Sequence, residues 1–340
     1  MKTGTIMSAA LLFTLPVVAA RAADPATGVK VTPSTYIRAE TDRSFHNIET
    51  LGGGINRFYH IRQPTPLDKQ TIVRMNRDTL YSGAVIDTSK GATITLPKAE
   101  KGRYMSILVI DNDHYAPTVI YEPGTHKLPT DTRYIMAVVR TQLLRPLDPT
   151  DIAVANRLQD QVKITAGSAV PMPPMRWDKA SLEALTKEYE AGAKRFPSYK
   201  GMMGPRGTVD EKTRQFAAAA AWGLFPEEHA TYLNYNGGES ADRCYEATYK
   251  VPDNKAFWSI TLYGGDGYMK SDNAILNKTN VKLNPDGTFT ARFGSKALCG
   301  DKPNRLDTSA GWNFLMRIYR PGASVLDGSY KLPKTHPVSP

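Results

Sequence analysis

A repeated pattern constrains the fold of this chain more than any other sequence feature. The stretch Arg103–Tyr115 (RYMSILVIDNDHY) returns as Ala256–Tyr268 (AFWSITLYGGDGY), and the downstream runs YIMAVVR from Tyr134 and FLMRIYR from Phe314 also match, each ending in Arg. The coinciding positions are Tyr104, Ser106, Ile107, Asp113 and Tyr115, which fall on Phe257, Ser259, Ile260, Asp266 and Tyr268. Self-similarity of this kind predicts an internal duplication of a β unit.

The pattern around the repeats is mostly β. From Thr71 to Gln142, short runs rich in Val, Ile, Thr and Tyr alternate with turn residues, as expected for antiparallel sandwiches. Helices are predicted after Thr32-Pro33, over Asp151 to Ile164, from Asp178 and from Asp210. The predicted fold is therefore mainly β with an α insert: two jelly-roll-like β-sandwich units related by internal duplication, with helices at the N-terminus and between the units.

The predicted organisation has five parts. They are a signal peptide at 1–22, an N-terminal helix and linker at 23–60, a first β unit at 61–145, a helical insert at 146–230 and a second β unit at 231–340.

The first 22 residues have the features of an export signal. Lys2 is followed by an apolar run from Ile6 to Ala20, and Ala20-Arg21-Ala22 places small residues where a signal peptidase cleaves. The apolar run is too short to span a membrane. We therefore expect a periplasmic or secreted protein that is not membrane-spanning.

Charge and cysteine content narrow the possible partners. Without Lys2 and Arg21 the 43 basic residues become 41, which against 33 acidic residues gives a net charge of +8. No run of five basic residues occurs, so no nucleic-acid partner is expected. Cys244 and Cys299 flank the second repeat. In an oxidising compartment such a pair favours a disulfide, which would stabilise by about 3–4 kcal/mol if unstrained, over the alternatives of a buried free thiol pair or a reactive Cys.

Several blocks together resemble a known family. The chain is similar to bacterial proteins that pair the domains of unknown function numbered 1254 and 1214, through blocks that cover most of the sequence from about Ile72 onward: NRDTLYSGAVIDTSKGATITLP, RYMSILVIDND, PEEHATYLNY, AFWSITLYGGDGYMKSDN and FLMRIYRPGASVLDGSYKLP. The resemblance implies a β-rich, double-jelly-roll-like fold and, in many members, export. It implies no activity. The short first half and compact middle of this chain depart from longer members.

The first candidate site is Asp111-Asn112-Asp113-His114, directly after a predicted strand. Oxygen ligands and an imidazole suit a divalent cation, and a carboxylate here can act as a general base, so Asp111, Asp113 and His114 are the candidate catalytic and metal residues. The alternative is a polar turn in which Asp and Asn side chains bond their own backbone.

The second candidate is a ligand site built from Asn76, Arg77, Asp78 and Tyr81. A guanidinium can grip a carboxylate, phosphate or sulfate through two hydrogen bonds, with the adjacent Asp holding it in place. The alternative is an internal ion pair of Arg77 with Asp78.

A third candidate is a strip on the second β unit. Strand alternation places aromatic and polar side chains on one sheet face, where sandwiches bind sugars or flat ligands, although packing of a second layer gives the same pattern. The candidate ligand-binding residues are Trp258, Tyr263, Asp266, Arg317 and Tyr319.

These observations leave two hypotheses about function. The first is an exported envelope protein that binds a small anionic or glycan ligand on a β-sandwich. The second is a periplasmic hydrolase that works either with a divalent cation as cofactor or without one. A homo-oligomer formed through open sheet edges is compatible with either one.

Overall fold

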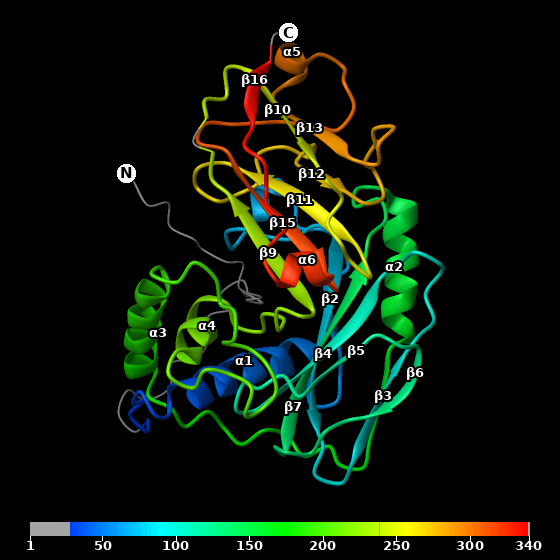
Figure 1. Cartoon of the computed structure of the whole chain (residues 1–340). Coiled ribbons are helices and arrows are strands. Elements are labelled where there is room, and N and C mark those ends of the chain that lie inside the picture. Colours follow the sequence, from blue (N-terminus) through cyan, green and yellow to red (C-terminus); the bar gives the residue numbers. More distant parts are fainter. Residues whose placement is uncertain (1–27, 238, 339–340) are drawn as a thin grey trace. The chain divides into compact units, whose positions relative to one another are not determined.

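The computed structural model describes residues 28–237 and 239–338 (Figure 1). The predicted signal peptide lies outside the described residues. The chain divides into two compact units. The described part of the N-terminal unit is 28–64 and 79–226, and that of the C-terminal unit is 65–78 and 227–338 except residue 238. No helix in the described ranges is long and apolar enough to cross a membrane.

The predicted mainly β fold is confirmed. In the part of the chain that the structure describes, sixteen strands form four sheets, and six α-helices accompany them. The N-terminal unit holds α1 (Tyr36–Gly52), β1 (Tyr59–His60), β2 (Thr79–Asp87), β3 (Ala92–Leu96), β4 (Met105–Asp111), β5 (Thr118–Ile120), β6 (Gly124–Lys127), β7 (Tyr134–Gln142), α2 (Pro149–Gln161), β8 (Lys163–Ala166), α3 (Lys179–Ala193) and α4 (Arg214–Ala220). The C-terminal unit holds η1 (Leu67–Lys69), β9 (Ala230–Tyr235), β10 (Cys244–Tyr249), β11 (Trp258–Tyr263), β12 (Ile275–Asn277), β13 (Phe289–Phe293), α5 (Lys296–Cys299), β14 (Arg305–Leu306), β15 (Asn313–Tyr319), α6 (Ala323–Leu326) and β16 (His336–Val338).

Two sheets make the core of the N-terminal unit. Their strand orders are β1-β2-β7-β4-β5 and β6-β3-β8. Alternate residues of the larger sheet, such as Ile86, Ile107 and Val139, are fully buried and pack in one cluster with Ile94 and Leu96 of β3. Because side chains alternate between the two faces of a strand, the other face of the larger sheet is left for a second covering layer.

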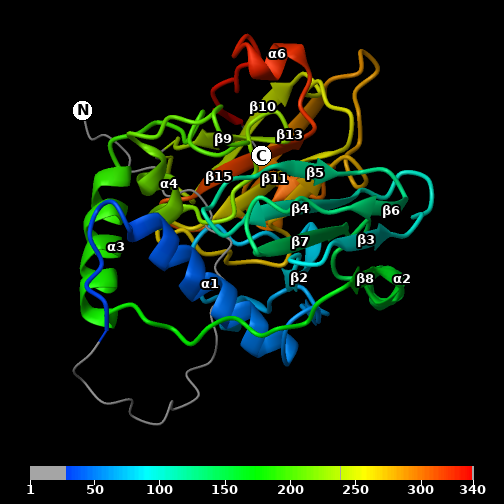
Figure 2. The same cartoon turned by 90° about the horizontal axis from the view of Figure 1, so that it is seen from below.

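Helices α1, α3 and α4 pack together beside these sheets (Figures 1 and 2). Their shared core contains Tyr36, Tyr189 and Phe216, with the rings of Tyr36 and Tyr189 meeting edge-on at 4.7 Å. The helix predicted from Asp178 is present as α3, and Asp178 caps it, since its carboxylate accepts from the Ser181 N–H at 2.8 Å.

Two predicted helices begin later than expected. α1 starts at Tyr36 rather than directly after Thr32-Pro33, because Thr32 and Thr35 first close a separate turn, with Thr35 N–H donating to Thr32 C=O at 3.0 Å. α4 starts at Arg214 rather than after Asp210, whose carboxylate accepts from the Lys212 N–H and forms an isolated turn.

The C-terminal unit is also built from two sheets. Their orders are β14-β13-β10-β16 and β12-β11-β15-β9. Between them lies an aromatic core in which Trp258 stacks on Phe289 at 4.5 Å and Phe293 stacks on Phe314 at 5.5 Å. The predicted disulfide is confirmed, since Cys244 and Cys299 are bonded across a sequence separation of 55.

The two units share a strand arrangement. The run β2-β7-β4-β5 of one corresponds to β9-β15-β11-β12 of the other, and all neighbours in both runs are antiparallel. Ser106 lies opposite Arg140 in the first, and Ser259 lies opposite Arg317 in the second. The strand register therefore makes Arg317 the structural counterpart of Arg140. The sequence match had instead placed Arg140 on Arg320, which is three residues further along the chain. Jelly-roll topology and duplication remain predictions.

The turns after β4 and β11 have the same hydrogen bonds. In Asp111–Tyr115 and in Gly264–Tyr268, the first N–H bonds to the fifth carbonyl and the fourth N–H bonds to the first carbonyl. The fourth residue has a positive φ in both, 62° at His114 and 84° at Gly267. His114 therefore occupies a left-handed position that glycine, lacking a Cβ, adopts without strain.

Residues 65–78 pack on the polar face of the β11 and β15 sheet. Tyr263 donates its hydroxyl to Met75 C=O at 2.9 Å, and Arg317 donates to Arg74 C=O at 2.7 Å. The Leu67 and Met75 side chains pack against the core of the C-terminal unit. This early segment of the chain is thus an integral layer of the C-terminal unit.

Candidate functional site: a cationic pocket in the N-terminal unit

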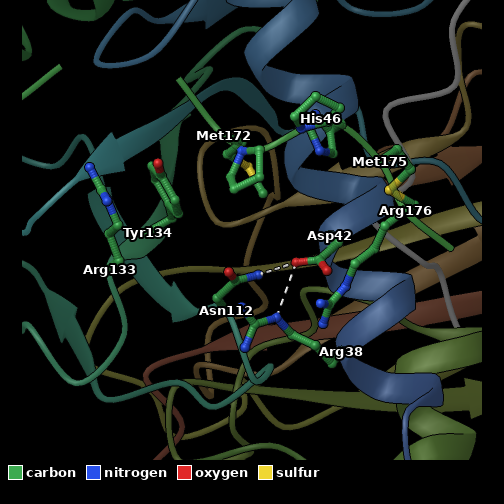
Figure 3. Close-up of a pocket in the computed structure, with 11 residues that line it drawn as sticks. Arg38, Asp42, His46, Asn112, Arg133, Tyr134, Met172, Met175 and Arg176 are labelled. Atoms are coloured by element: carbon green, nitrogen blue, oxygen red, sulfur yellow. Dashed lines mark hydrogen bonds and ion pairs between the residues drawn. The ribbon is translucent and has the colours of Figure 1, made fainter. Parts of the chain in front are cut away.

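A pocket of about 320 Å³ opens in the N-terminal unit (Figure 3). It is lined by four segments that are far apart in the sequence. They contribute Arg38, Asp42 and His46 from α1, Asn112 from the turn after β4, Arg133 and Tyr134 from the start of β7, and Met172, Pro173, Pro174, Met175 and Arg176 from the connection to α3. Ligand pockets in proteins begin at about this size.

The floor of the pocket is one face of α1. Arg38, Asp42 and His46 are spaced four residues apart, so they lie on the same side of the helix. Both oxygens of Asp42 are already engaged: Oδ1 accepts from Arg38 Nε at 3.1 Å and from Asn112 Nδ2 at 2.8 Å, and Oδ2 accepts from Trp177 Nε1 at 2.7 Å. Asp42 therefore orders its neighbours and has little capacity left to accept from a ligand.

Two further arginines stand at the rim. The Arg133 guanidinium lies over the Tyr134 ring at 5.3 Å and is 3.4 Å from Asp87 Oδ2. The Arg176 guanidinium lies over the Trp177 ring at 4.8 Å and has no ion-pair partner among the described residues. Stacking on a ring holds a guanidinium in place while its N–H groups remain available. The lining thus includes three arginines and one carboxylate. Arg38 is paired with Asp42 and Asp113, and Arg133 with Asp87, so Arg176 is the lining arginine whose charge no carboxylate of the described residues balances.

Asp87 anchors the wall of the pocket. Its carboxylate is fully buried and accepts from the Ser89 and Ser168 hydroxyls, both at 2.6 Å, and from the Val170 N–H at 3.0 Å. Burial opposes ionisation of this group, but these hydrogen bonds outweigh it and hold the pKa of Asp87 well below its usual range. Asp87 is therefore a charged partner for Arg133 at neutral pH.

The predicted Asp111 to His114 site forms a polar turn at one end of this pocket. Asp111 Oδ1 accepts from the N–H groups of Asp113 and Tyr115, both at 2.9 Å, and Oδ2 lies 3.3 Å from Arg206. Burial is the main cause that raises the pKa of Asp111. Asp113 pairs with Arg38 at 3.0 Å and with Arg206 at 2.8 Å. Both carboxylates are thus tied to arginines and to the turn itself.

His114 is turned into the interior, away from solvent. Its ring is 1% exposed, stacks on Trp222 at 5.2 Å, and accepts from the Gly223 N–H through Nε2 at 3.3 Å. We infer that the ring proton is on Nδ1, because Nε2 is the acceptor. In residues 28–237 and 239–338, no three His, Cys, Asp or Glu side chains are grouped so that they could hold a metal ion.

The buried imidazole should make stability depend on pH. Burial, with Arg214 as a second cause, lowers the pKa of His114 to about 3, whereas an unfolded histidine titrates near 6.5. Between pH 6.5 and pH 3 the imidazole is protonated in the unfolded chain but neutral in the folded state. The free energy of unfolding therefore decreases as the pH falls from about 6.5 toward 3. We expect the N-terminal unit to lose about 2 kcal/mol from this group between pH 7 and pH 5.

Urea unfolding of the wild type and of His114→Asn at both pH values measures this contribution. Asparagine tolerates a positive φ and does not titrate. Burial also lowers the pKa of His60 to about 4, which acts in the same direction, so only the difference between the two proteins reports His114. Parallel pH profiles would show that His114 is not the group responsible.

The second predicted cluster lies in the layer formed by residues 65–78. Arg77 pairs with Asp272 at 2.8 Å rather than with Asp78. Asn76 Oδ1 accepts from the Asp78 N–H at 2.8 Å, and the fully buried Asp78 accepts from Asn277 Nδ2 at 3.1 Å. Burial raises the pKa of Asp78. Tyr81 belongs to the N-terminal unit, where Arg140 lies over its ring at 5.5 Å.

The predicted strip on the C-terminal unit is divided between two faces and a loop. Arg317 is 1% exposed and donates to the Tyr263 hydroxyl at 2.8 Å, while Tyr319 stacks on Phe257 at 4.4 Å. Trp258 lies in the aromatic core on the opposite sheet face. Asp266 lies in the turn after β11 and pairs with Lys270 at 2.6 Å. The structure therefore brings Arg317 and Tyr263 together but not Trp258 or Asp266.

Comparison with family models decides the family. Residues 55–116 match a protein family of unknown function, DUF1254, and residues 235–323 match a second one, DUF1214. The chain is a paired DUF1254 and DUF1214 protein. No curated protein matches the sequence.

Solved structures show the same fold for this DUF1254 and DUF1214 protein. The VPA0106 protein from Vibrio parahaemolyticus is 16% identical with a TM-score of 0.68, over 89% of this chain and 96% of that one. An uncharacterised protein from Burkholderia cenocepacia is 15% identical with a TM-score of 0.51, over 90% of this chain and 88% of that one. At this level of identity the likeness concerns the fold alone.

Sequence patterns did not reveal the pocket of the DUF1254 and DUF1214 protein. Only Asn112 belongs to a predicted candidate site, because that turn reaches the pocket. The arginines come from three segments that carry no common motif. The one local signal was the Met172–Arg176 run, MPPMR, in which two prolines and two methionines precede an arginine.

Proposed function

We propose that this protein binds a small anion in the cationic pocket of its N-terminal unit. The observation that carries the proposal is the Arg176 guanidinium at a cavity of about 320 Å³: it has no ion-pair partner among the described residues, Arg38 and Arg133 line the same cavity, and the one lining carboxylate, Asp42, is satisfied within the protein. Carboxylate, sulfate and phosphate groups match guanidinium geometry. The arginines favour an anion over a neutral glycan.

We further propose that this binding takes place outside the cytosol. The signal-like segment Met1–Ala22 supports this assignment at the level of sequence. The Cys244–Cys299 disulfide supports it independently, since disulfides persist in oxidising compartments. The hydrolase alternative has no comparable support, because Asp111 and Asp113 are bound to arginines and the His114 ring is buried.

Replacing Arg176 should weaken anion binding without affecting folding. We expect Arg176→Gln to reduce the affinity for sulfate about tenfold, near the lower limit of the about 1.5–3 kcal/mol that a hydrogen bond to a charged group contributes, because this arginine is exposed. Isothermal titration calorimetry at low ionic strength on the chain from residue 23 measures the affinity. Raising the salt concentration should weaken binding in both proteins.

Arg195→Gln is the matched control. Arg195 is also exposed and also stacks on an aromatic ring, at 4.4 Å from Phe216, but it does not line the pocket. Its replacement removes the same charge from the same unit. Equal losses in both variants would indicate a diffuse effect of net charge, and an absence of sulfate or phosphate binding by the wild type would overturn the proposed function.

A further inference from the structure

One wall of the cationic pocket is apolar. Met172, Pro173, Pro174 and Met175 line it in sequence before Arg176. The Met175 side chain is 40% exposed, although large hydrophobic side chains are usually covered in this protein. Val170, two residues before Met172, is also 48% exposed. Apolar surface therefore continues from inside the pocket to its rim.

This wall is held rigidly at both ends. At one end the Tyr134 hydroxyl donates to Pro171 C=O at 2.9 Å, and Met172 N–H donates to Glu49 Oε1 at 3.3 Å. At the other end Val29 N–H donates to Arg176 C=O at 2.7 Å. Consecutive prolines fix φ between the anchors. An apolar ligand group can thus contact the wall with little loss of conformational entropy in the protein.

The charged and apolar groups are interleaved around one cavity. Figure 3 shows the Met172 side chain between Arg133 and Tyr134 on one side and the side chains of α1 on the other. Methionine adapts its shape to varied apolar partners. A ligand held by the arginines would therefore lie against thioether and proline carbons.

We propose that the ligand is an amphiphilic organic anion, with one sulfate, carboxylate or phosphate head group and a short alkyl or aryl body. This inference rests on the proposed anion binding and adds the class of ligand. The arginines bind the head group, and the Met172–Met175 wall binds the body. Burial of each methylene should increase affinity about fourfold until the pocket is full.

A homologous series of alkyl sulfates tests the proposal. Calorimetry on the chain from residue 23 would compare inorganic, ethyl, butyl and hexyl sulfate below micellar concentrations, with hexanol as the uncharged probe. We expect affinity to rise from ethyl to hexyl by more than tenfold, and hexanol to bind far more weakly than hexyl sulfate. Anionic lipid vesicles form a separate arm: co-sedimentation with them would identify a membrane lipid, not a free ion, as the source of the head group.

Variants separate the two parts of the site. Met175→Gln should flatten the dependence of affinity on chain length, so that hexyl sulfate loses more affinity than ethyl sulfate does, because Met175 lies in the apolar wall and carries no charge. Arg176→Gln should weaken every member of the series. Leu283→Gln removes a side chain that is 50% exposed in the C-terminal unit and should change nothing.

The two proposals fail in different ways. Equal affinity for inorganic, ethyl and hexyl sulfate would overturn the amphiphilic ligand and leave anion binding intact. Hexanol binding as tightly as hexyl sulfate would also overturn it, since the head group would then contribute nothing. If none of the anions binds, anion binding itself is overturned.

Discussion

Asp151→Ala should destabilise the N-terminal unit by about 3 kcal/mol. Arg103 and Asp151 are paired at 2.6 Å, with side chains only 1% and 3% exposed. Removing one partner from a buried ion pair leaves the other charge without compensation, which costs about 3–5 kcal/mol. Glu100, paired with the same guanidinium at 2.7 Å, should keep the loss near the lower limit. Urea unfolding followed by circular dichroism measures the change.

An exposed pair in the same unit provides the control. Arg62 and Asp160 are also 2.6 Å apart, but their side chains are 38% and 59% exposed, so Asp160→Ala should cost less than about 1 kcal/mol. The double variant R103M/D151L removes both buried charges and should recover much of the loss. If the double variant is as unstable as Asp151→Ala, the unpaired guanidinium is not the cause, and the loss comes from packing or from the hydrogen bond that Arg145 N–H donates to Asp151 Oδ2 at 3.0 Å.

Removing the disulfide should have a comparable effect on the C-terminal unit. For a loop of 55 residues, loss of the Cys244–Cys299 cross-link is expected to cost about 4 kcal/mol through the entropy of the unfolded chain. Hydrogen exchange of the C244A/C299A variant, read segment by segment, measures the loss. Amides of β10 and β13 should exchange faster.

The N-terminal unit is the internal control for this experiment. It has no disulfide among its described residues, so amides of β4 and β7 should exchange as in the wild type. Faster exchange in both units would mean that the cross-link stabilises the whole chain. Unchanged exchange of the β10 amides would contradict the prediction, because it would show that the disulfide does not stabilise this strand against unfolding.

Features that depend on neighbouring residues were predictable from sequence. The Asp178 cap follows from a carboxylate three residues before a free N–H, and the disulfide from two cysteines beside one β repeat. The alignment of Asp111–Tyr115 with Gly264–Tyr268 corresponds to identical backbone hydrogen bonds. In the cap and in the two turns the interacting groups are a few residues apart. The cysteines are separated by 55 residues, and their position on either side of one repeat was the reason for pairing them.

Features that depend on distant residues were not predictable. Arg38, Asn112, Arg133 and Arg176 meet only because α1 and the connection before α3 pack beside the β4 and β7 ends of one sheet. No periodicity in the sequence reports which helix covers which strand end. The positive φ of His114 was not predicted either, although the repeat aligns this residue with Gly267, which also has a positive φ.

The predicted strip shows a limit of a different kind. Trp258 and Tyr263 both lie in β11, but an odd spacing separates them, so they face opposite sides of the sheet. Trp258 joins the aromatic core, and Tyr263 faces the layer formed by residues 65–78. Alternation along the strand was sufficient to place Trp258 and Tyr263 on opposite faces of the sheet. It could not predict that residues 65–78 cover the face on which Tyr263 lies.

The position of residues 65–78 in the chain has a consequence for biogenesis. A ribosome makes this layer before most of the N-terminal unit, yet the β11 and β15 sheet that receives it is encoded only after residue 227. A nascent chain that ends at Pro226 therefore carries the complete sequence of one unit together with an orphan strip containing Leu67 and Met75. Such a strip is a target for chaperones and proteases until synthesis is finished, and its late docking closes a long loop, which makes it a slow folding step.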